Sequence, residues 1–295
     1  MDNNEKVACE ICHQPSRLAL VIKGYQHFRC STCDHLFVWP RPSQVELDRF
    51  YADASYYDGA ELQVQRIHRE ATARVKLLSG FCDEFNLKRR LLDVGCASGY
   101  FMSVAMENGF TVVGQDRSQE IADRAKSKYG FDVKVGTIED NLTDTEAFPV
   151  VTAWEVVEHA RDPEAFFRAF SNIVSPHGIL AISTPMGDGL PAKILRQNYP
   201  MLTPPEHLSI FSSKSILLLA EKFGFKQIYS SSFSNLDIRG MASGFSRIMF
   251  GKKLNDVSSL KQMISLGVGG TCFAVPWVVD KIGYGTEMMV IFRKQ

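Results

Sequence analysis

The sequence predicts an α/β protein with a doubly wound, seven-stranded, mostly parallel sheet, preceded by a small cysteine-rich module. Three observations support this fold class. After Arg90, short apolar runs alternate with amphipathic stretches, which is the pattern of right-handed βαβ units. A glycine-bearing loop, residues 91–101, includes the first of these runs. Four cysteines near the N-terminus form two C-x2-C pairs, which is typical of a zinc ribbon.

The N-terminal module, residues 1–45, is expected to bind one zinc ion. Seventeen residues separate its two cysteine pairs, and the predicted ligands are Cys9, Cys12, Cys30 and Cys33. Four thiolates leave no open coordination position, so this zinc would be structural. The alternative is that the ribbon helps to bind the protein's substrate. The remaining cysteines are expected to be packing residues: Cys82, Cys96 and Cys272.

The composition excludes several classes of protein. Hydrophobic residues make up 45% of the 295, and Lys plus Arg equal Asp plus Glu at 33 each, so no global field favours nucleic acid or an anionic membrane. The N-terminus lacks the order of a signal peptide, so we expect a cytoplasmic protein. The longest apolar stretch, residues 263–279, is interrupted by glycines and a proline, so no transmembrane span is expected.

Two further parts follow the ribbon. Residues 46–88 are expected to form a connecting segment with a helix over 61–87. Residues 89–295 would form the sheet domain, with a helical insertion at 237–285, because so long a simple loop is rare. The apolar side chains of this insertion could pack as an extra layer, line an acceptor pocket or form a homodimer face: Phe245, Ile248, Met249, Phe250, Phe273, Val275 and Trp277.

The elements of the sheet domain follow one another in regular order. Strands are predicted at 91–94, 111–115, 133–135, 150–154, 179–183, 227–231 and 287–292, and helices at 100–108, 119–128, 163–173 and 214–223.

The first βα loop is the expected ligand site. A ligand there would meet backbone N–H groups at the positive end of a helix, and Gly95 and Gly99 would let it approach the main chain. The dinucleotide fingerprint G-x-G-x-x-G fails in this register, because Ala97 and Tyr100 occupy glycine positions.

Asp116 follows the second strand, where an acidic residue in a mononucleotide-binding half binds ribose hydroxyls. Its alternative is a surface turn or a helix N-cap. After the third strand, Ile138 could pack on an adenine ring and Asp140 could accept from its amino group, although a solvated acidic loop is the competing interpretation.

The loop resembles the D-x-G-x-G-x-G loop of class I S-adenosylmethionine-dependent methyltransferases, with Ala97 in place of the middle glycine. Residues 153–163, 174–180 and 205–212 resemble other segments of that family, in a subgroup with ubiquinone-type O-methyltransferases and zinc-ribbon tailoring enzymes. The resemblance implies a Rossmann-like fold and S-adenosylmethionine as cofactor. The assigned cofactor-binding residues are Asp93, Gly95, Cys96, Ala97, Gly99, Asp116, Ile138, Asp140 and Trp154.

A second set of polar residues follows the fourth strand. If this segment is helical, Glu155, Glu158 and His159 project from one face at the carboxyl end of the sheet. With His207 they could bind Mg²⁺, Mn²⁺ or Zn²⁺, and the arrangement resembles the Glu-x-x-Glu-His plus His site of some methyltransferases. The alternatives are a metal-free general base at His159 or His207, or residues that only pack and order loops. The candidate catalytic residues are His159, Glu155 and His207.

These features predict transfer of a methyl group to a small-molecule, sugar or polysaccharide acceptor. One alternative is an RNA methyltransferase that holds nucleic acid with the ribbon, which the neutral charge disfavours. Another is a non-catalytic zinc-ribbon adaptor, which the intact glycine loop disfavours.

Overall fold

The computed structural model describes residues 7–51, 64–141, 147–234, 243, 246–252, 258, 261–262, 264–266, 280 and 283–295. Its larger sheet has seven strands in the order β11-β12-β9-β8-β5-β6-β7. Their bounds are β5 Arg90–Val94, β6 Thr111–Asp116, β7 Val133–Val135, β8 Phe148–Trp154, β9 Val174–Pro185, β11 Phe225–Phe233 and β12 Glu287–Lys294. Strand β12 runs opposite to the other six strands, so the predicted mostly parallel, seven-stranded sheet is confirmed.

The topology places a crevice between β5 and β8. The chain leaves β5 towards β6 and β7 on one side and later returns to β8 and β9 on the other. At such a switch point the loops after the strands diverge, and ligands of open α/β sheets bind there.

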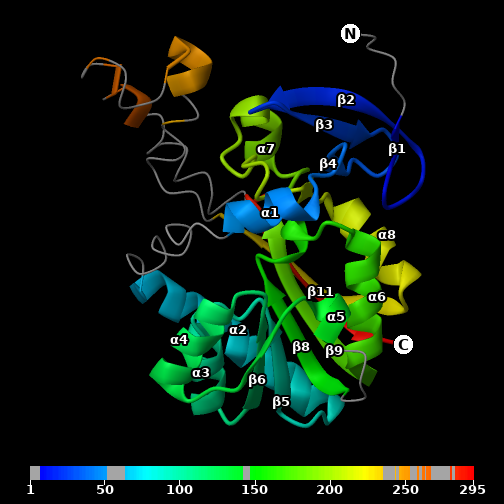
Figure 1. Cartoon of the computed structure of the whole chain (residues 1–295), viewed down its shortest axis with the longest axis vertical. Coiled ribbons are helices and arrows are strands. Elements are labelled where there is room, and N and C mark those ends of the chain that lie inside the picture. The colour runs from blue at the N-terminus through cyan, green and yellow to red at the C-terminus, as the bar shows by residue number, and fades with distance from the viewer. Residues whose placement is uncertain are drawn as a thin grey trace.

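Helices cover both faces of the sheet. On one face α2 (Val64–Phe85) and α3 (Tyr100–Glu107) share an apolar cluster with Leu91. On the other, α6 (Pro163–Ile173) and α8 (Ser213–Lys222) share a cluster with Leu92. Successive residues of β5 therefore point to opposite faces, as a sheet buried on both sides requires. Helix α4 (Gln119–Tyr129) and the short α5 (Ile138–Asn141) complete the layers (Figure 1).

Residues 174–178, which precede the fifth predicted strand, belong with it to the single strand β9. Val174 already pairs with Phe148, and pairing resumes between Ile179 and Val150, so the four residues between them bulge out of the ladder. His177 adopts a left-handed φ of 61°, the conformation that a glycine would adopt at lower cost.

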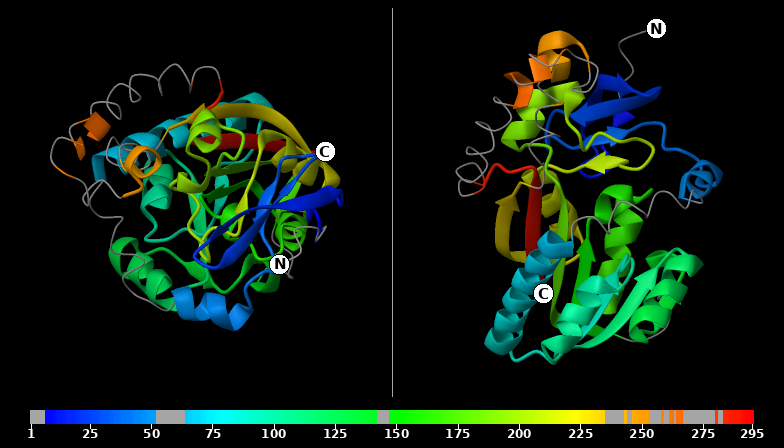
Figure 2. Two further views of the ribbon diagram at one scale, coloured as in Figure 1. Left: turned by 90° about the horizontal axis from the view of Figure 1, so that it is seen from above. Right: turned by 90° about the vertical axis from the view of Figure 1, so that its left-hand side faces the viewer.

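The N-terminal strands form a second, antiparallel sheet with the order β1-β2-β3-β4-β10. Four strands belong to the ribbon: β1 Val7–Ala8, β2 Pro15–Ile22, β3 Tyr25–Cys30 and β4 Leu36–Val38. The fifth, β10 (Ser209–Ile210), comes from the sheet domain. Figures 1 and 2 show the ribbon stacked on one end of the sheet domain, with α1 (Gln44–Tyr51) between them and α7 (Leu190–Leu195) beside it.

Most of the predicted insertion at 237–285 lies outside the described residues, including Phe245, Cys272, Phe273, Val275 and Trp277. Residues 246–250 are helical, and Ile248 and Met249 are exposed there. The role of this insertion in an acceptor pocket or a homodimer stays a prediction. Among the described helices, none is long and apolar enough to cross a membrane.

Candidate active site

The loop between β5 and α3 is shaped by glycine. Gly95 and Gly99 have φ values of 68° and 79°, in the left-handed region that side chains rarely adopt. A Cβ on Gly95 would lie 2.6 Å from a methyl group of Val156. Ala97 also has a positive φ, 46°, so alanine is accommodated at the middle position with some strain. The loop therefore exposes its main chain at the N-terminal end of α3.

Asp116 ends β6 and holds this loop. Its carboxylate accepts hydrogen bonds from the N–H groups of Ala97 and Ser118, both at 3.0 Å. Burial raises its pKa, against the effect of these bonds. The N-cap of α4 is Ser118 and not Asp116. The alternative of a simple cap therefore does not describe Asp116, which instead faces the cavity over the loop.

A cavity of about 470 Å³ lies at the crevice. This is within the roughly 300–1,000 Å³ range of small-molecule sites. Several predicted site residues line it: Gly95, Ala97, Asp116, Ile138, Trp154, Glu155 and His159. A loop without large side chains and a buried carboxylate suit the close approach and the ribose hydroxyls of an adenosyl cofactor.

Three predicted cofactor residues do not line the cavity. Asp93 accepts a 2.6 Å hydrogen bond from Thr152, and burial raises its pKa to about 7. The Cys96 thiol packs with Met102 and Phe131. A Cβ on Gly99 would approach the ring of Phe131 to 3.0 Å. The contacts of these residues shape the loop, and their direct contact with a cofactor stays a prediction. The side chain of Asp140 lies outside the described residues.

The sequence analysis missed one wall of the cavity. Gln44 and Leu47 of α1 line it, although Gln44 was assigned to the ribbon module and Leu47 to the connecting segment, and neither to the site. An ion pair of 2.9 Å between Asp48 and Arg117 attaches this helix to the sheet domain, and Arg117 directly follows Asp116. Arg161 adds a hydrogen bond of 3.0 Å from its Nε to the carbonyl of Pro42. No local pattern predicts this contact, because it joins segments far apart in the chain.

A second cluster borders the cavity. One ligand atom from each of Glu158, His159 and His207 lies within 4.8 Å of the others. The Nδ1 atoms of the two histidines lie 3.0 Å from the carbonyl of Glu206 and 2.7 Å from that of Met201. A carbonyl can only accept, so each Nδ1 carries the proton and each Nε2 keeps its lone pair in the neutral ring.

The carboxylate of Glu158 completes this arrangement. Its Oε2 accepts a 3.0 Å bond from Thr184, whereas its Oε1 is buried without a hydrogen-bond partner among the described residues and lies 3.9 Å from Nε2 of His159. Burial and the nearby Glu155 raise the pKa of Glu158, and burial lowers that of His159 to about 3. An orphaned carboxylate oxygen and two oriented imidazoles form a donor set that fits a divalent cation.

The expectation that Glu155 shares a helical face with these residues is wrong. Glu155 has a left-handed φ of 55°, and only Val157–His159 form a turn, of the 3-10 type. The clustered ligand atoms therefore exclude Glu155, whose buried Oε1 has no described hydrogen-bond partner. The sequence analysis also missed the buried Tyr199, which donates a 2.6 Å bond to the carbonyl of Thr286 and whose pKa is raised by burial and by the charges of Glu287 and Glu155.

The ribbon cysteines converge as predicted. Their four sulfur atoms lie within 4.8 Å of one another, with nearest separations of 3.4–3.5 Å. The N–H groups of Ile11 and Thr32 point to the sulfurs of Cys9 and Cys30 at 3.4 Å. Such a set fits a tetrahedral zinc ion with no open position.

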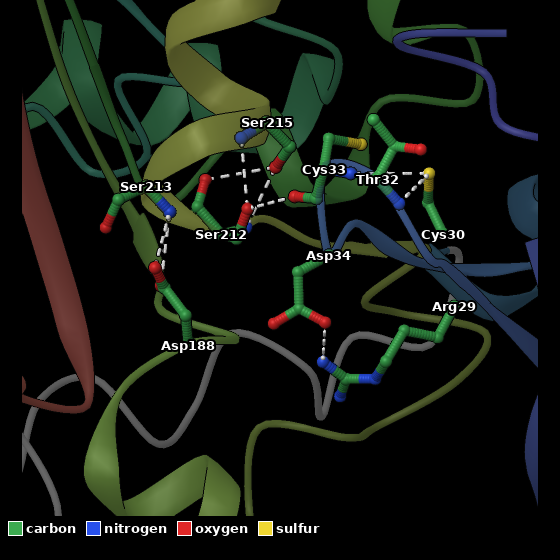
Figure 3. A network of polar contacts seen from close by, with 9 residues as sticks. All are labelled: Arg29, Cys30, Thr32, Cys33, Asp34, Asp188, Ser212, Ser213 and Ser215. Carbon is green, nitrogen blue, oxygen red and sulfur yellow. Dashed lines mark hydrogen bonds and ion pairs between the residues drawn. The ribbon is translucent and has the colours of Figure 1, made fainter. Parts of the chain in front are cut away.

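The ribbon is anchored to the sheet domain. Arg41 donates to the carboxylate of Glu10, to the carbonyl of Leu208 and to the hydroxyl of Ser209. Ser212, the N-cap of α8, donates to the carbonyl of Cys33 (Figure 3). Ribbon and sheet domain thus share buried contacts, and Arg41 joins the first cysteine knuckle to the segment directly after His207.

Comparison with known proteins agrees with this geometry. Residues 63–230 match a family described as "Methyltransferase domain". The ubiquinone biosynthesis O-methyltransferase of Bartonella tribocorum is 28% identical over 156 residues, which cover 48% of this chain and 63% of that protein. The Brucella ovis enzyme of the same name is 33% identical over 155 residues, covering 46% and 62%. The chain thus spans less than two thirds of the length of these curated relatives.

Two solved structures share the fold. The geranyl diphosphate C-methyltransferase of Streptomyces coelicolor has a TM-score of 0.51 at 14% identity, over 79% of this chain and 82% of that one. A chain from the Haloferax volcanii complex of the Trm112 methyltransferase activator with a methyltransferase has a TM-score of 0.54 at 16% identity, over 84% and 96%. With its glycine loop and its sheet topology, the chain belongs to the class I S-adenosylmethionine-dependent methyltransferases.

Proposed function

We propose that this protein transfers a methyl group from S-adenosylmethionine to a hydroxyl of a small-molecule acceptor, with a divalent cation bound by Glu158, His159 and His207. The observation that carries the proposal is the position of His159, which lines the cofactor cavity and also belongs to the ligand cluster. The names of the O-methyltransferase relatives support a small-molecule acceptor and oxygen as the methylated atom.

The chain's own residues would hold and align the reactants. The main chain at Gly95 and Ala97 would let the cofactor approach closely, Asp116 would accept from ribose hydroxyls, and Ile138 would pack on the adenine ring. S-adenosylmethionine supplies a methyl group on a sulfonium, so the S–C bond breaks as the O–C bond forms. Gln44 and Leu47 of α1 would help to exclude water from this displacement.

The acceptor proton must leave as the new bond forms. A divalent cation held by the cluster would lower the pKa of the acceptor hydroxyl. Without a cation, the unprotonated Nε2 of His159 or His207 would serve as the general base. A metal requirement for turnover separates these two mechanisms.

The structure gives the nucleic-acid alternative no added support. In the ribbon, Arg41 is buried against Glu10 and would have to give up this carboxylate to bind a phosphate. A sugar acceptor is still compatible with the proposed chemistry and belongs in any acceptor screen.

Titration calorimetry with S-adenosylhomocysteine tests the cofactor site. Wild type should bind, and Asp116→Ala should bind at least about tenfold more weakly, because two charge-assisted hydrogen bonds to the ribose would be lost. Asp123→Ala, at an exposed position on α4, is the matched control and should bind like wild type. Absence of binding to wild type would overturn the cofactor assignment, and unchanged affinity of Asp116→Ala would overturn the ribose role.

A further inference from the structure

A second, larger cavity lies beside the cofactor site. It is a groove of about 940 Å³ between α2 and the strands β11 and β12. Its apolar lining comes from both sides and comprises Ala73, Leu77, Gly80, Phe81, Tyr229, Phe233 and Met289. The proposed methyl transfer assigns no role to this groove.

The floor of the groove continues to the cofactor cavity. Trp154 is in register with Ser183, Ser183 with Met289, and Met289 with Ser231. Side chains in register across a sheet point to the same face. One row therefore crosses the sheet from Trp154, which lines the cofactor cavity, to Met289 and Ser231, which line the groove.

This row contains two polar atoms without partners. Nε1 of Trp154 and Oγ of Ser183 are buried and make no hydrogen bond within the described part of the chain. Such orphaned groups are rare in folded proteins and cost free energy unless water or a ligand satisfies them. They lie at the end of the row next to the cofactor cavity, where an acceptor would present its reactive, polar end.

Arg74 occupies the junction of the two cavities. Its guanidinium lies 4.5 Å from the centre of the Trp154 ring and 5.8 Å from that of Phe233. It lines the groove, is only partly exposed, and forms no ion pair with any residue that the structure describes. A guanidinium that lies against aromatic rings keeps its N–H donors available for a carboxylate or phosphate.

Helix α2 presents small residues to the groove, which leaves space beside the helix. Gly80 lies within this long helix, where glycine costs about 1 kcal/mol relative to alanine. A Cβ on Gly80 would meet no atom within 4 Å, so the position faces open space. One turn before Leu77, Ala73 also presents a short side chain to the groove.

We propose that this groove is the acceptor site and that it takes an elongated, amphipathic acceptor with an anionic group near the methylated atom. Arg74 would bind the anion beside Trp154, and the apolar body would lie along Leu77, Phe81 and Met289. This inference rests on the proposed function, because methyl transfer makes the Trp154 end the reactive one.

The test uses a fluorescent probe of this chemistry, 11-(dansylamino)undecanoic acid, with its methyl ester as the neutral counterpart. Wild type should bind the acid in a saturable manner and at least tenfold more tightly than the ester. Arg74→Met should remove this preference. Gly80→Trp and Ala73→Trp should each weaken binding at least tenfold by filling the groove. Thr72→Trp is the matched control, because Thr72 is exposed on α2 but does not line the groove.

Two further readouts separate this inference from the proposed function. Affinity for S-adenosylhomocysteine should stay unchanged in the tryptophan variants, and its absence in wild type would count against the function and not the groove. Once an acceptor is found by screening, the probe should compete with it for methyl transfer. Equal probe binding by wild type and Gly80→Trp, no preference for the acid, or full methyl transfer with the groove saturated would each overturn the proposal.

Discussion

Two ligand clusters in this protein differ in how they are built. The four ribbon cysteines come from one stretch of 25 residues, Cys9 to Cys33, and their sulfurs meet in a closed set. The second cluster combines Glu158 and His159 with His207, which lies 48 residues after His159, and it borders a cavity. A closed set of four thiolates suits a structural ion, whereas three N and O ligands leave coordination positions for a substrate. The comparison teaches that local sequence builds the cysteine set, whereas tertiary folding builds the cluster that we propose as the reactive centre.

The largest expected effect is at the closed cluster. Cys33→Ser should lose the zinc and with it much of the folding free energy, since structural zinc contributes on the order of 10 kcal/mol in small modules. The ribbon cysteines also share the main apolar core with Phe211 and Ile216, so the damage should spread to the sheet domain. Metal analysis and scanning calorimetry measure this: the zinc content should fall by one ion per chain, with a markedly lower Tm.

Cys82→Ser is the matched control for this prediction. Cys82 is buried in the cluster between α2 and the sheet, far from the ribbon in sequence. This variant should keep its zinc and lose only about 1–3 kcal/mol of stability, the cost of burying a poorly satisfied hydroxyl. A Cys33→Ser protein as stable as Cys82→Ser would show that the ribbon is not structural.

At the open cluster, formed by Glu158, His159 and His207, we expect a smaller effect on stability but a large effect on turnover. His207→Ala should retain the ribbon zinc and its affinity for S-adenosylhomocysteine. Turnover should fall about 10²-fold or more, because neither the cation nor the histidine base would help to deprotonate the acceptor hydroxyl. Methyl-transfer assays with added Mn²⁺ or Mg²⁺, and after chelation, provide the measurement. If a Glu158→Ala, His207→Ala double variant turns over at the wild-type rate without metal, the cluster has no chemical role.

The smallest effect is expected at the link between the two clusters. Arg41 binds Glu10 of the ribbon and the main chain directly after His207, and the N–H of Leu208 also donates to the carbonyl of Glu158 at 2.9 Å. Arg41→Gln should therefore weaken Mn²⁺ binding at the open cluster roughly tenfold, as loss of a supporting hydrogen bond does in other metal sites.

Arg29→Gln controls for the loss of an arginine from the ribbon. Arg29 pairs with Asp34 at the ribbon surface, where an ion pair contributes little. Its Mn²⁺ affinity should equal that of wild type, and both variants should keep their zinc. Equal Mn²⁺ affinity in Arg41→Gln and Arg29→Gln would mean that the ribbon does not position His207.

Much of the fold was predictable because its signals are local. Apolar runs and glycine positions predict β5, the loop after it and α3, since strand burial and left-handed backbone depend on neighbouring residues. The position of Asp116 at the end of β6 followed from the order of elements alone. The Glu155 expectation failed because a helical period was assumed where the chain turns sharply at a left-handed residue.

The sequence by itself determined the doubly wound sheet, the cysteine spacing of the ribbon and the glycine loop, because each depends on residues close together in the chain. Only the tertiary structure decided that β10 extends the ribbon sheet, that α1 lines the cavity over the glycine loop, and that His207 lies beside Glu158 and His159. It also decided which side chains form the row from Trp154 to Ser231. These contacts join residues far apart in the chain, and strand register and packing, which leave no periodic signal in the sequence, determine which of them meet.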